Sequence, residues 1–188
     1  NKQLTSVWRE AISGVLDAYL GEVPDNFKVD GKTLNPIQYM GQLAIEPSEY
    51  MEISSFTHHD FYEPFELEVP DNWLHRKVQN VPLKELVRIT EDALQNGYSV
   101  AWGADVSEAG FSHRYGLGVI PENTSTLKEK EAFLSPVKER EVTQAYRQMG
   151  YDNYETQDDH AMHIIGMCRD QIGKRFFIVK NSWGTSNY

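Results

Sequence analysis

The chain has 188 residues, of which 40% are hydrophobic and 24% are charged, a composition typical of a globular domain that can bury a core. Its 18 basic and 28 acidic residues give a formal net charge of −10, which argues against a surface for nucleic acid or for an anionic membrane. The sequence contains no run of apolar residues long enough to predict a membrane span. A single cysteine excludes an internal disulfide.

The first part of the chain is predicted to be helical and then irregular. Apolar residues repeat at helical spacing over residues 4–20, and Gly21 follows as a stop. Asn35-Pro36 predicts the start of a short second helix that ends near residue 43, because Asn caps helices and Pro favours the first turn. Residues 45–75 are rich in aromatic and acidic side chains, and we expect them to fold over a core rather than to form one.

The second part of the chain mixes helices and strands. A third helix is expected from Pro82-Leu83 to Asn96-Gly97, followed by a buried strand over residues 98–106. Gly-, Ser- and Thr-rich loops follow to residue 134, with a charged cluster at residues 128–131 on a solvated face. A helix is expected over residues 142–149 and an acidic loop over residues 150–159. The mixture predicts an α+β fold with antiparallel strands.

The end of the chain predicts a β-hairpin. Two apolar runs flank Gln171-Ile172-Gly173-Lys174, whose glycine marks a turn. His160 lies near the start of the first strand, and Asn181 lies near the end of the second, 21 residues later. Antiparallel pairing can therefore bring the two residues side by side.

These positions suit a histidine that works as a base. The side-chain carbonyl of Asn181 can accept a hydrogen bond from one imidazole nitrogen of His160, which fixes the tautomer and aims the other nitrogen at a nucleophile. Trp183, expected to be a core residue, can shield that bond from water. We therefore predict that His160 and Asn181 are catalytic and that Trp183 supports them.

These residues also carry a family resemblance. Residues 160–162 (His-Ala-Met) and 179–184 (Val-Lys-Asn-Ser-Trp-Gly) resemble the histidine and asparagine boxes of papain-like cysteine peptidases. Residues 94–106 (Leu-Gln-Asn-Gly-Tyr-Ser-Val-Ala-Trp-Gly-Ala-Asp-Val), with 115–118 (Tyr-Gly-Leu-Gly) and 34–39 (Leu-Asn-Pro-Ile-Gln-Tyr), are similar to the bleomycin hydrolase and aminopeptidase C branch. The resemblance covers residues 92–118 and 157–184 well, and residues 33–82 more thinly.

The resemblance implies a papain-like peptidase fold. Residues 1–188 are then one papain-like region, incomplete at both ends, with a helical and irregular insert over 1–82 and a sheet lobe with the His/Asn hairpin over 83–188. The implied activity is hydrolysis at peptide N-termini through a Cys-His-Asn mechanism, with no metal or organic cofactor. The implied partners are a peptide substrate, the remaining cysteine-bearing part of the same enzyme and copies of itself in a homo-oligomer, but no nucleic acid and no membrane.

The nucleophile is the missing part of this pattern. Family members keep the catalytic cysteine N-terminal to the histidine, in a Gly-x-Cys-Trp type box, and this chain has no such box. The single cysteine, Cys168, follows His160 by eight residues on the same predicted strand, which places the two roughly 26 Å apart at about 3.3 Å per residue. We expect Cys168 to be an inert structural thiol and the nucleophile to lie outside these residues.

Other polar residues are weaker candidates. His163 is expected on the opposite strand face from His160. His58-His59 with Asp60 invites a zinc interpretation, but adjacent histidines on an extended segment point apart and no further Cys or His box completes a tetrahedral set, so no metal site is predicted there. Asp158-Asp159 is expected to be a solvated acidic pair rather than a modulator of the imidazole. Asp105 is either structural or part of the cleft.

Two rival functions remain at this point. A catalytically dead papain-like module would bind peptides in the same cleft, and a Ser, Ala or Gly in place of the nucleophilic cysteine would mark it. A transglutaminase-like acyltransferase also uses Cys-His chemistry, but its orienting residue is usually Asp, so Asn181 counts against it.

Overall fold

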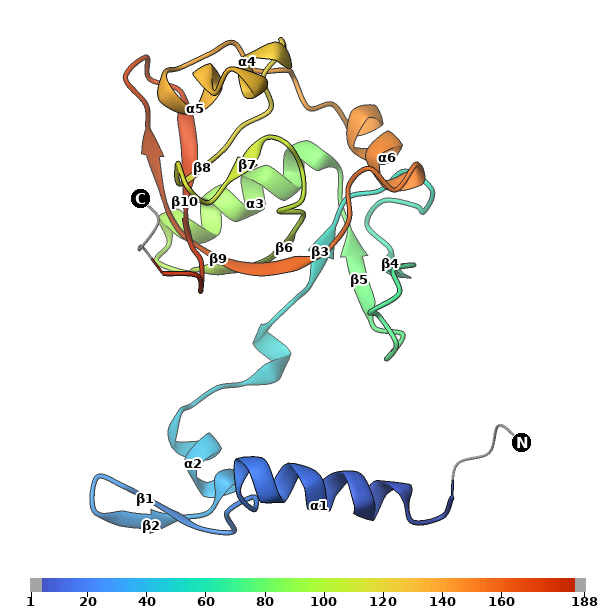
Figure 1. Cartoon of the computed structure of the whole chain (residues 1–188), viewed down its shortest axis with the longest axis vertical. Coiled ribbons are helices and arrows are strands. Elements are labelled where there is room, and N and C mark those ends of the chain that lie inside the picture. The colour runs from blue at the N-terminus through green and yellow to red at the C-terminus, as the bar shows by residue number, and fades with distance from the viewer. Residues whose placement is uncertain (1–4, 185–188) are drawn as a thin grey trace. The chain divides into compact units, whose positions relative to one another are not determined.

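The computed structural model describes residues 5–184, and its residues divide into two compact units, 1–50 and 51–188 (Figure 1). The first unit contains α1 (Trp8–Leu20), an antiparallel pair of β1 (Phe27–Val29) and β2 (Lys32–Leu34), α2 (Pro36–Gln42) and the 3-10 helix η1 (Pro47–Glu49). The two helices predicted in this part of the chain are thus confirmed. The division falls at residue 50, within the stretch 1–82 that the sequence groups together.

Helix α2 begins at the predicted cap. The Asn35 side chain accepts from the backbone N–H of Gln38 at 2.8 Å, and the Gln38 side chain accepts from the backbone N–H of Asn35 at 3.0 Å. This reciprocal capping box satisfies two backbone donors that the first helical turn leaves unpaired. Helix α1, by contrast, buries none of its residues, and Leu34 is the only buried residue among residues 5–50.

The main sheet of the second unit has the order β10-β9-β6 and is antiparallel throughout. It consists of β6 (Val100–Ala104), β9 (His160–Arg169) and β10 (Arg175–Lys180), with α3 (Leu83–Gln95) in contact with β6 and β9. The predicted hairpin is confirmed, and Gly173 in its turn has a positive φ of 85°. The Asp170 side chain accepts from the backbone N–H groups of Ile172 and Lys174 and closes this turn.

A second sheet gathers residues that the sequence left irregular. Strand β5 (Lys77–Asn80) pairs in parallel with β3 (Ile53–Ser54) and antiparallel with β4 (Pro64–Glu66). Phe56, Phe65 and Val78 form a buried cluster against which Leu67 and Tyr151 pack. The expectation that residues 45–75 only cover a core is therefore wrong, because their aromatic side chains build one.

The loops between β6 and β9 contain short elements: β7 (Phe111–Ser112) pairs with β8 (Leu117–Gly118), and α4 (Ser125–Lys128) and α5 (Glu131–Leu134) follow. The prediction of loops alone to residue 134 missed these elements, while the charged residues 128–131 are exposed as expected. Helix α6 (Gln144–Asp152) lies slightly C-terminal to its predicted range, because the Thr143 hydroxyl caps it by accepting from Tyr146 N–H.

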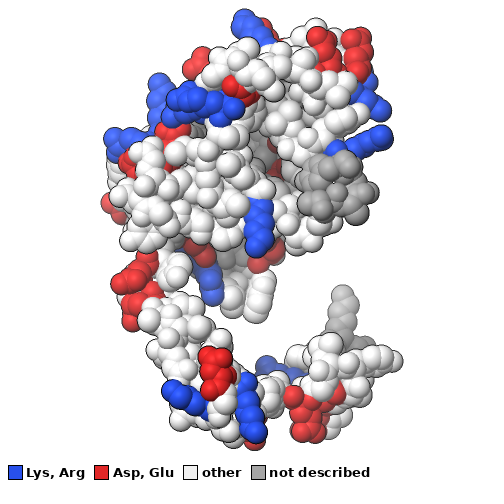
Figure 2. All heavy atoms as spheres, turned by 90° about the vertical axis from the view of Figure 1, so that its left-hand side faces the viewer, with Lys and Arg blue, Asp and Glu red and all other residues white. Residues whose placement is uncertain are grey.

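On the face in Figure 2, basic and acidic side chains lie interspersed among large uncharged areas. Among the described residues, the helices are all too short or too polar to cross a membrane.

Candidate active site

The structure brings His160 and Asn181 together. His160 is the first residue of β9, and Asn181 follows the last residue of β10. The His160 Nε2 atom lies 2.8 Å from the Asn181 side-chain oxygen, and the contact is partly buried. The expected hydrogen bond between the two predicted site residues is thus present.

A β-bulge puts both residues on the same side of the sheet. Ile178 pairs with Gly166, but the next residue, Val179, pairs with Ile164, so Ile165 has no partner of its own. A one-residue change of register moves every following side chain to the other face. Without the bulge, Asn181 would lie on the face opposite His160, so this irregularity is what assembles the pair.

The bonds around Asn181 also settle which imidazole nitrogen is free to react. The Asn181 oxygen accepts from the backbone N–H of Ser182 at 2.7 Å as well as from His160. The backbone N–H of Ser182 can only donate, so the Asn181 atom that it meets is the carbonyl oxygen, which can only accept. His160 therefore carries its proton on Nε2, and its Nδ1 lone pair is available as a base.

Trp183 lies against the pair as predicted, but it is not a core residue. Its ring centroid is 4.6 Å from that of His160, at an interplanar angle of 40°. Phe111 and His113 make edge contacts with the other parts of the indole. The side chain nevertheless remains 44% exposed, so Trp183 covers one side of the histidine and leaves its own outer surface open.

On the sheet face that carries His160, the central strand residues are buried, whereas the surface next to His160 and Asn181 is exposed. Met162 and Ile164 are buried at 7% and 6% exposure. Trp102 pairs with Met162 across β6 and β9 and is 41% exposed. Exposed apolar surface on this face therefore includes Trp102 and Trp183, whereas Met162 and Ile164 are already buried within the described residues. The predicted fully buried strand at residues 98–106 is likewise half-exposed.

Comparison with known proteins identifies the fold that carries this pair. Residues 125–187 match the family model of the papain family cysteine proteases. The crystal structure of PepW from Lactobacillus rhamnosis HN001 superposes with a TM-score of 0.67 at 19% identity, over 93% of this chain. The chain has a papain-like cysteine peptidase fold. It spans 40% of the length of the PepW chain. No curated protein matches the sequence.

Two acidic residues tie the papain-like hairpin to the end of β6. Asp105 accepts from the backbone N–H groups of Ser107 and Gln157, each at 2.7 Å, and Asp159 accepts from Val106 N–H at 3.0 Å. Burial raises the pKa of Asp105, but hydrogen bonds from Ser107, Gln157 and the following backbone lower it by more than burial raises it. The net pKa therefore lies below its usual value. Asp105 is therefore a structural residue that fixes the entry to β9.

Asp158 does not face His160. A Cβ atom on Gly103 would come within 2.8 Å of an Asp158 carboxylate oxygen, and Gly103 pairs with Ala161 on the opposite face from His160. Partial burial, with the negative charges of Asp71 and Asp159, raises the pKa of Asp158. Asp158 lines a shallow pocket of about 180 Å³ beside Asp71 on that other side.

The remaining histidine and cysteine of β9 lie away from the pair. His163 is exposed and its Nε2 is 2.7 Å from the Ser99 hydroxyl, on the face opposite His160, as predicted. Cys168 is exposed and pairs with Phe176 near the turn of the hairpin, at the far end of the strand from His160. Within residues 5–184, the strand therefore offers His160 no thiol at bonding distance.

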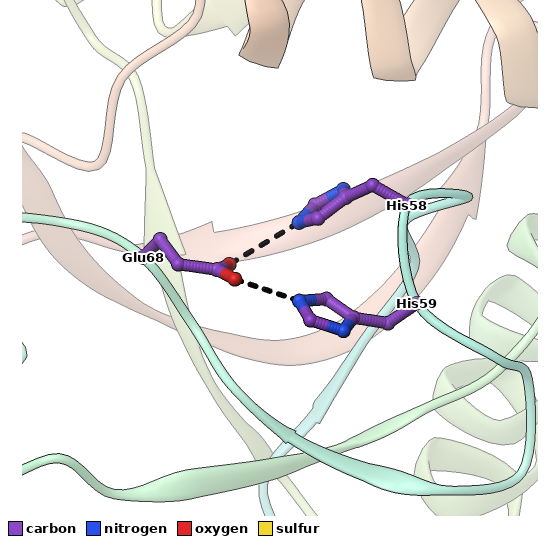
Figure 3. A group of neighbouring side chains, drawn as sticks. All are labelled: His58, His59 and Glu68. Carbon is purple, nitrogen blue, oxygen red and sulfur yellow. Dashed lines mark hydrogen bonds and ion pairs between the residues drawn. The ribbon is translucent and has the colours of Figure 1, made fainter.

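The prediction that His58 and His59 point apart is wrong. Their segment is bent rather than extended, and both Nε2 atoms face the Glu68 carboxylate, at 3.2 Å and 2.7 Å (Figure 3). Asp60, the acidic neighbour in sequence, is not the shared partner. Glu68 lies nine and ten residues further along the chain, and no local pattern in the sequence identifies it.

Proposed function

We propose that the chain is part of a cysteine peptidase of the aminopeptidase C and bleomycin hydrolase type, which removes residues from peptide N-termini. The observation that carries the proposal is the 2.8 Å bond between His160 Nε2 and the Asn181 side-chain oxygen on a papain-like fold. The exopeptidase specificity rests on the sequence resemblance alone.

In this mechanism, His160 moves a proton between two partners. Its Nδ1 takes the proton of a cysteine thiol supplied by a segment outside these residues, and the thiolate attacks the peptide carbonyl carbon. The imidazolium then gives that proton to the leaving amine as the C–N bond breaks. A water molecule, deprotonated by the same nitrogen, hydrolyses the acyl-enzyme and restores the thiol. Asn181 holds the ring throughout, and as an uncharged acceptor it orients the ring in both protonation states.

The open surface beside the pair is where the rest of the enzyme would pack. Trp102 and Trp183 present 41% and 44% of their surface on the side that carries His160. We expect the cysteine-bearing part to cover these indoles and to form the other wall of a peptide cleft. A homo-oligomer is a further part of the proposal by resemblance.

The test compares two histidines of one strand in the full gene product that contains these residues. Cleavage of aminoacyl fluorogenic peptides should be blocked by a thiol-alkylating reagent. His160→Ala should lower kcat by about 10²–10⁴-fold, the usual contribution of a general acid–base. His163→Ala, on the opposite face, is the matched control and should leave kcat within twofold. Equal losses in both variants, or cleavage that survives alkylation, would overturn the proposal.

The 188 residues alone provide a second test. They should not cleave these substrates, because a base without its thiolate lacks the covalent route. Thiol-dependent cleavage by this chain that is lost in Cys168→Ser would contradict the assignment.

The alternative, a peptide-binding module without activity, is favoured by one observation, the absence of a cysteine beside His160 among residues 5–184. Saturable peptide binding without turnover by the full gene product would support that alternative.

A further inference from the structure

His58, His59 and Glu68 form a three-residue cluster of metal-ligating side chains. One ligand atom from each residue, a ring nitrogen of each histidine and a carboxylate oxygen, lies within 4.8 Å of the other two. Each Nε2 is close to a different oxygen of Glu68, at 3.2 Å for His58 and 2.7 Å for His59. The three donors therefore converge on one small volume (Figure 3).

Aromatic neighbours hold both imidazole rings in place. The His58 ring stacks on Tyr151 at 5.2 Å with an interplanar angle of 10°, and the His59 ring stacks on Phe65 at 4.6 Å and 26°. The Tyr151 hydroxyl donates to the backbone oxygen of Glu68 at 3.0 Å. Ring stacking and the Tyr151 hydrogen bond thus help to preorganise the two rings and the Glu68 segment.

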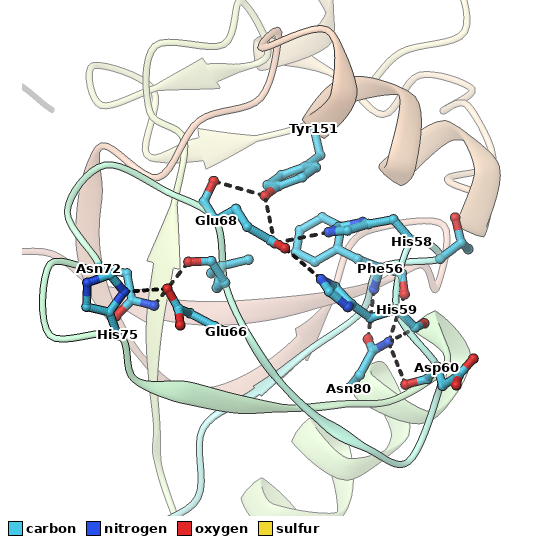
Figure 4. Close-up of polar contacts among 12 residues, drawn as sticks. Phe56, His58, His59, Asp60, Glu66, Glu68, Asn72, His75, Asn80 and Tyr151 are labelled. Carbon is cyan, nitrogen blue, oxygen red and sulfur yellow. Dashed lines mark hydrogen bonds and ion pairs between the residues drawn. The ribbon is translucent and has the colours of Figure 1, made fainter.

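The backbone of the histidine loop is fixed by a fully buried side chain, Asn80 (Figure 4). Its side-chain oxygen accepts from Phe56 N–H at 2.9 Å. Its amide nitrogen donates to the carbonyl oxygens of Phe56, His59 and Asp60 at 2.8, 3.0 and 3.2 Å. A buried amide with all its bonds made gives the loop one conformation, so the two histidines cannot easily separate.

The cluster is negatively charged and open to solvent. Burial raises the pKa of Glu68, but hydrogen bonds from His59 and His58 lower it by more than burial raises it. The carboxylate is therefore ionised at neutral pH. The side chains of His58, His59 and Glu68 keep 31%, 35% and 53% of their surface exposed. An ion can therefore reach the donors, and a water molecule can occupy a further coordination position.

We propose that His58, His59 and Glu68 bind one divalent transition-metal ion of the zinc class. Two imidazole nitrogens and one carboxylate oxygen are a donor set that Zn²⁺ and Co²⁺ accept, with the fourth tetrahedral position left to water. Ligand atoms about 2.0–2.1 Å from a tetrahedral ion lie roughly 3.3 Å from one another. The two Nε2 atoms lie 3.2 Å and 2.7 Å from different oxygens of Glu68, and one ligand atom from each residue lies within 4.8 Å of the other two, so the side chains must shift to bring three ligand atoms to tetrahedral spacing around one ion. The proposal does not depend on the peptidase activity.

Metal binding requires a proton rearrangement at His58 that can be observed. The buried Gln148 donates its amide to His58 Nδ1 at 2.9 Å, so in this structure the His58 proton sits on Nε2 and points at Glu68. A metal on Nε2 moves that proton to Nδ1. The Gln148 amide, which also bonds Thr57 N–H at 2.6 Å and Asp152 at 2.8 Å, must then turn or withdraw. Coordination and simple hydrogen bonding thus demand opposite tautomers of the same ring.

The first experiment titrates the chain with Co²⁺ and follows the visible d–d absorption of the bound ion. We expect saturation at one ion per chain. His59→Ala and the nearly isosteric Glu68→Gln should each weaken binding by about tenfold or more. The matched control is His75→Ala, because His75 pairs with Glu66 on the same segment but without a second histidine. That variant should bind Co²⁺ like the parent, and circular dichroism should show that each variant is folded.

The second experiment adds Zn²⁺ to ¹⁵N-histidine-labelled chain and reads the imidazole tautomers by NMR. Coordination should shift His58 and His59 to the Nδ1–H form. Three results would each overturn the proposal: no Co²⁺ band in the folded chain, a band retained in both Glu68→Gln and His59→Ala, or rings that keep the Nε2–H form at saturating Zn²⁺. The cluster would then be a hydrogen-bonded clamp of the loop only.

Discussion

The two histidine sites of the second unit, His160 with Asn181 and His58–His59 with Glu68, are built in opposite ways. In both, an imidazole Nε2 meets a side-chain oxygen at 2.7–3.2 Å. The first pair sits where two adjacent strands end, and a bulge sets its orientation. The second lies on a bent loop, which hydrogen bonds from buried side chains far away in the sequence hold in place. Pairing of adjacent strands, with its bulge, fixes the first site, and packing against residues distant in sequence fixes the second.

The chemistry of the two acceptors differs as well. Asn181 is neutral, and its carbonyl oxygen can accept from an imidazole or an imidazolium N–H, which suits a group that must take up and release a proton. Glu68 is charged, so it attracts a cation to the two rings beside it. This difference is why we assign proton transfer to one site and ion binding to the other.

The largest effect is expected when the hydrogen bonds of Asn80, which support the histidine loop of the second site, are removed. Asn80→Leu leaves the buried N–H of Phe56 and the carbonyls of Phe56 and His59 without partners, each at about 1–3 kcal/mol. We expect the free energy of unfolding to fall by more than about 3 kcal/mol in urea denaturation. Asn72→Ala, which removes bonds of the same kind at a less buried position, should cost about 1 kcal/mol. A smaller loss for Asn80→Leu than for Asn72→Ala would refute the role of Asn80.

A somewhat smaller effect is expected at the first site, and it concerns activity rather than stability. Asn181→Ala frees the His160 ring, and the loss of a productive orientation typically lowers turnover by about 10²-fold. The measurement is kcat on aminoacyl fluorogenic substrates in the full gene product. Ser182→Ala is the control, since Ser182 bonds Asn181 through its backbone only and should keep its kcat. Unchanged turnover in Asn181→Ala would show that the ring needs no orienting partner.

A substitution at Gly103 tests whether the sheet face opposite His160 affects catalysis. Gly103→Ala would place a Cβ 2.8 Å from an oxygen of Asp158 on the face opposite His160. Because the end of that side chain can shift, we expect a loss of about 1 kcal/mol in the free energy of unfolding, within the usual range for point substitutions. The kcat of the full gene product should stay within twofold. A tenfold fall in kcat without a matching loss of stability would indicate that Asp158 acts on His160 after all.

The smallest effect is the pH dependence that Glu68 contributes. Its pKa is lowered in the folded chain, so its contribution to stability is present above the unfolded value of about 4.3 and is lost as the pH falls through the folded pKa. Since the side chain is 53% exposed, Glu68→Gln should cost no more than about 1 kcal/mol at pH 7. The difference between parent and variant should shrink on acidification. A difference that grows at low pH would reverse the assigned sign.

The contrast between the two sites also separates what the sequence could predict from what it could not. The hairpin, the pairing of His160 with Asn181 and the capped helix α2 follow from local patterns, because each partner lies one turn or one strand away. The Ile165 bulge that places Asn181 on the correct face leaves no mark in the apolar alternation, although the site depends on it. The exposure of Trp183 was missed because exposure depends on what packs beside the hairpin.

The second site was not predictable in the same sense. Asn80 and Gln148 hold the histidine loop from 21–24 and about 90 residues away. Such contacts become visible only when the aromatic cluster of Phe56, Phe65 and Val78 has formed. The adjacent histidines suggest a metal site, but on an extended backbone they would point apart. The observed bend instead turns both rings toward Glu68.

The most direct test of the central claim is a double-mutant cycle on His160 and Asn181 in the full gene product. If Asn181 acts by orienting His160, its removal has nothing left to disturb once the histidine is gone. We predict that kcat/KM of the double variant His160→Ala/Asn181→Ala equals that of His160→Ala within about twofold, although Asn181→Ala alone lowers it by about 10²-fold. Losses that multiply would show that the two residues act independently and would contradict the proposed catalytic pair.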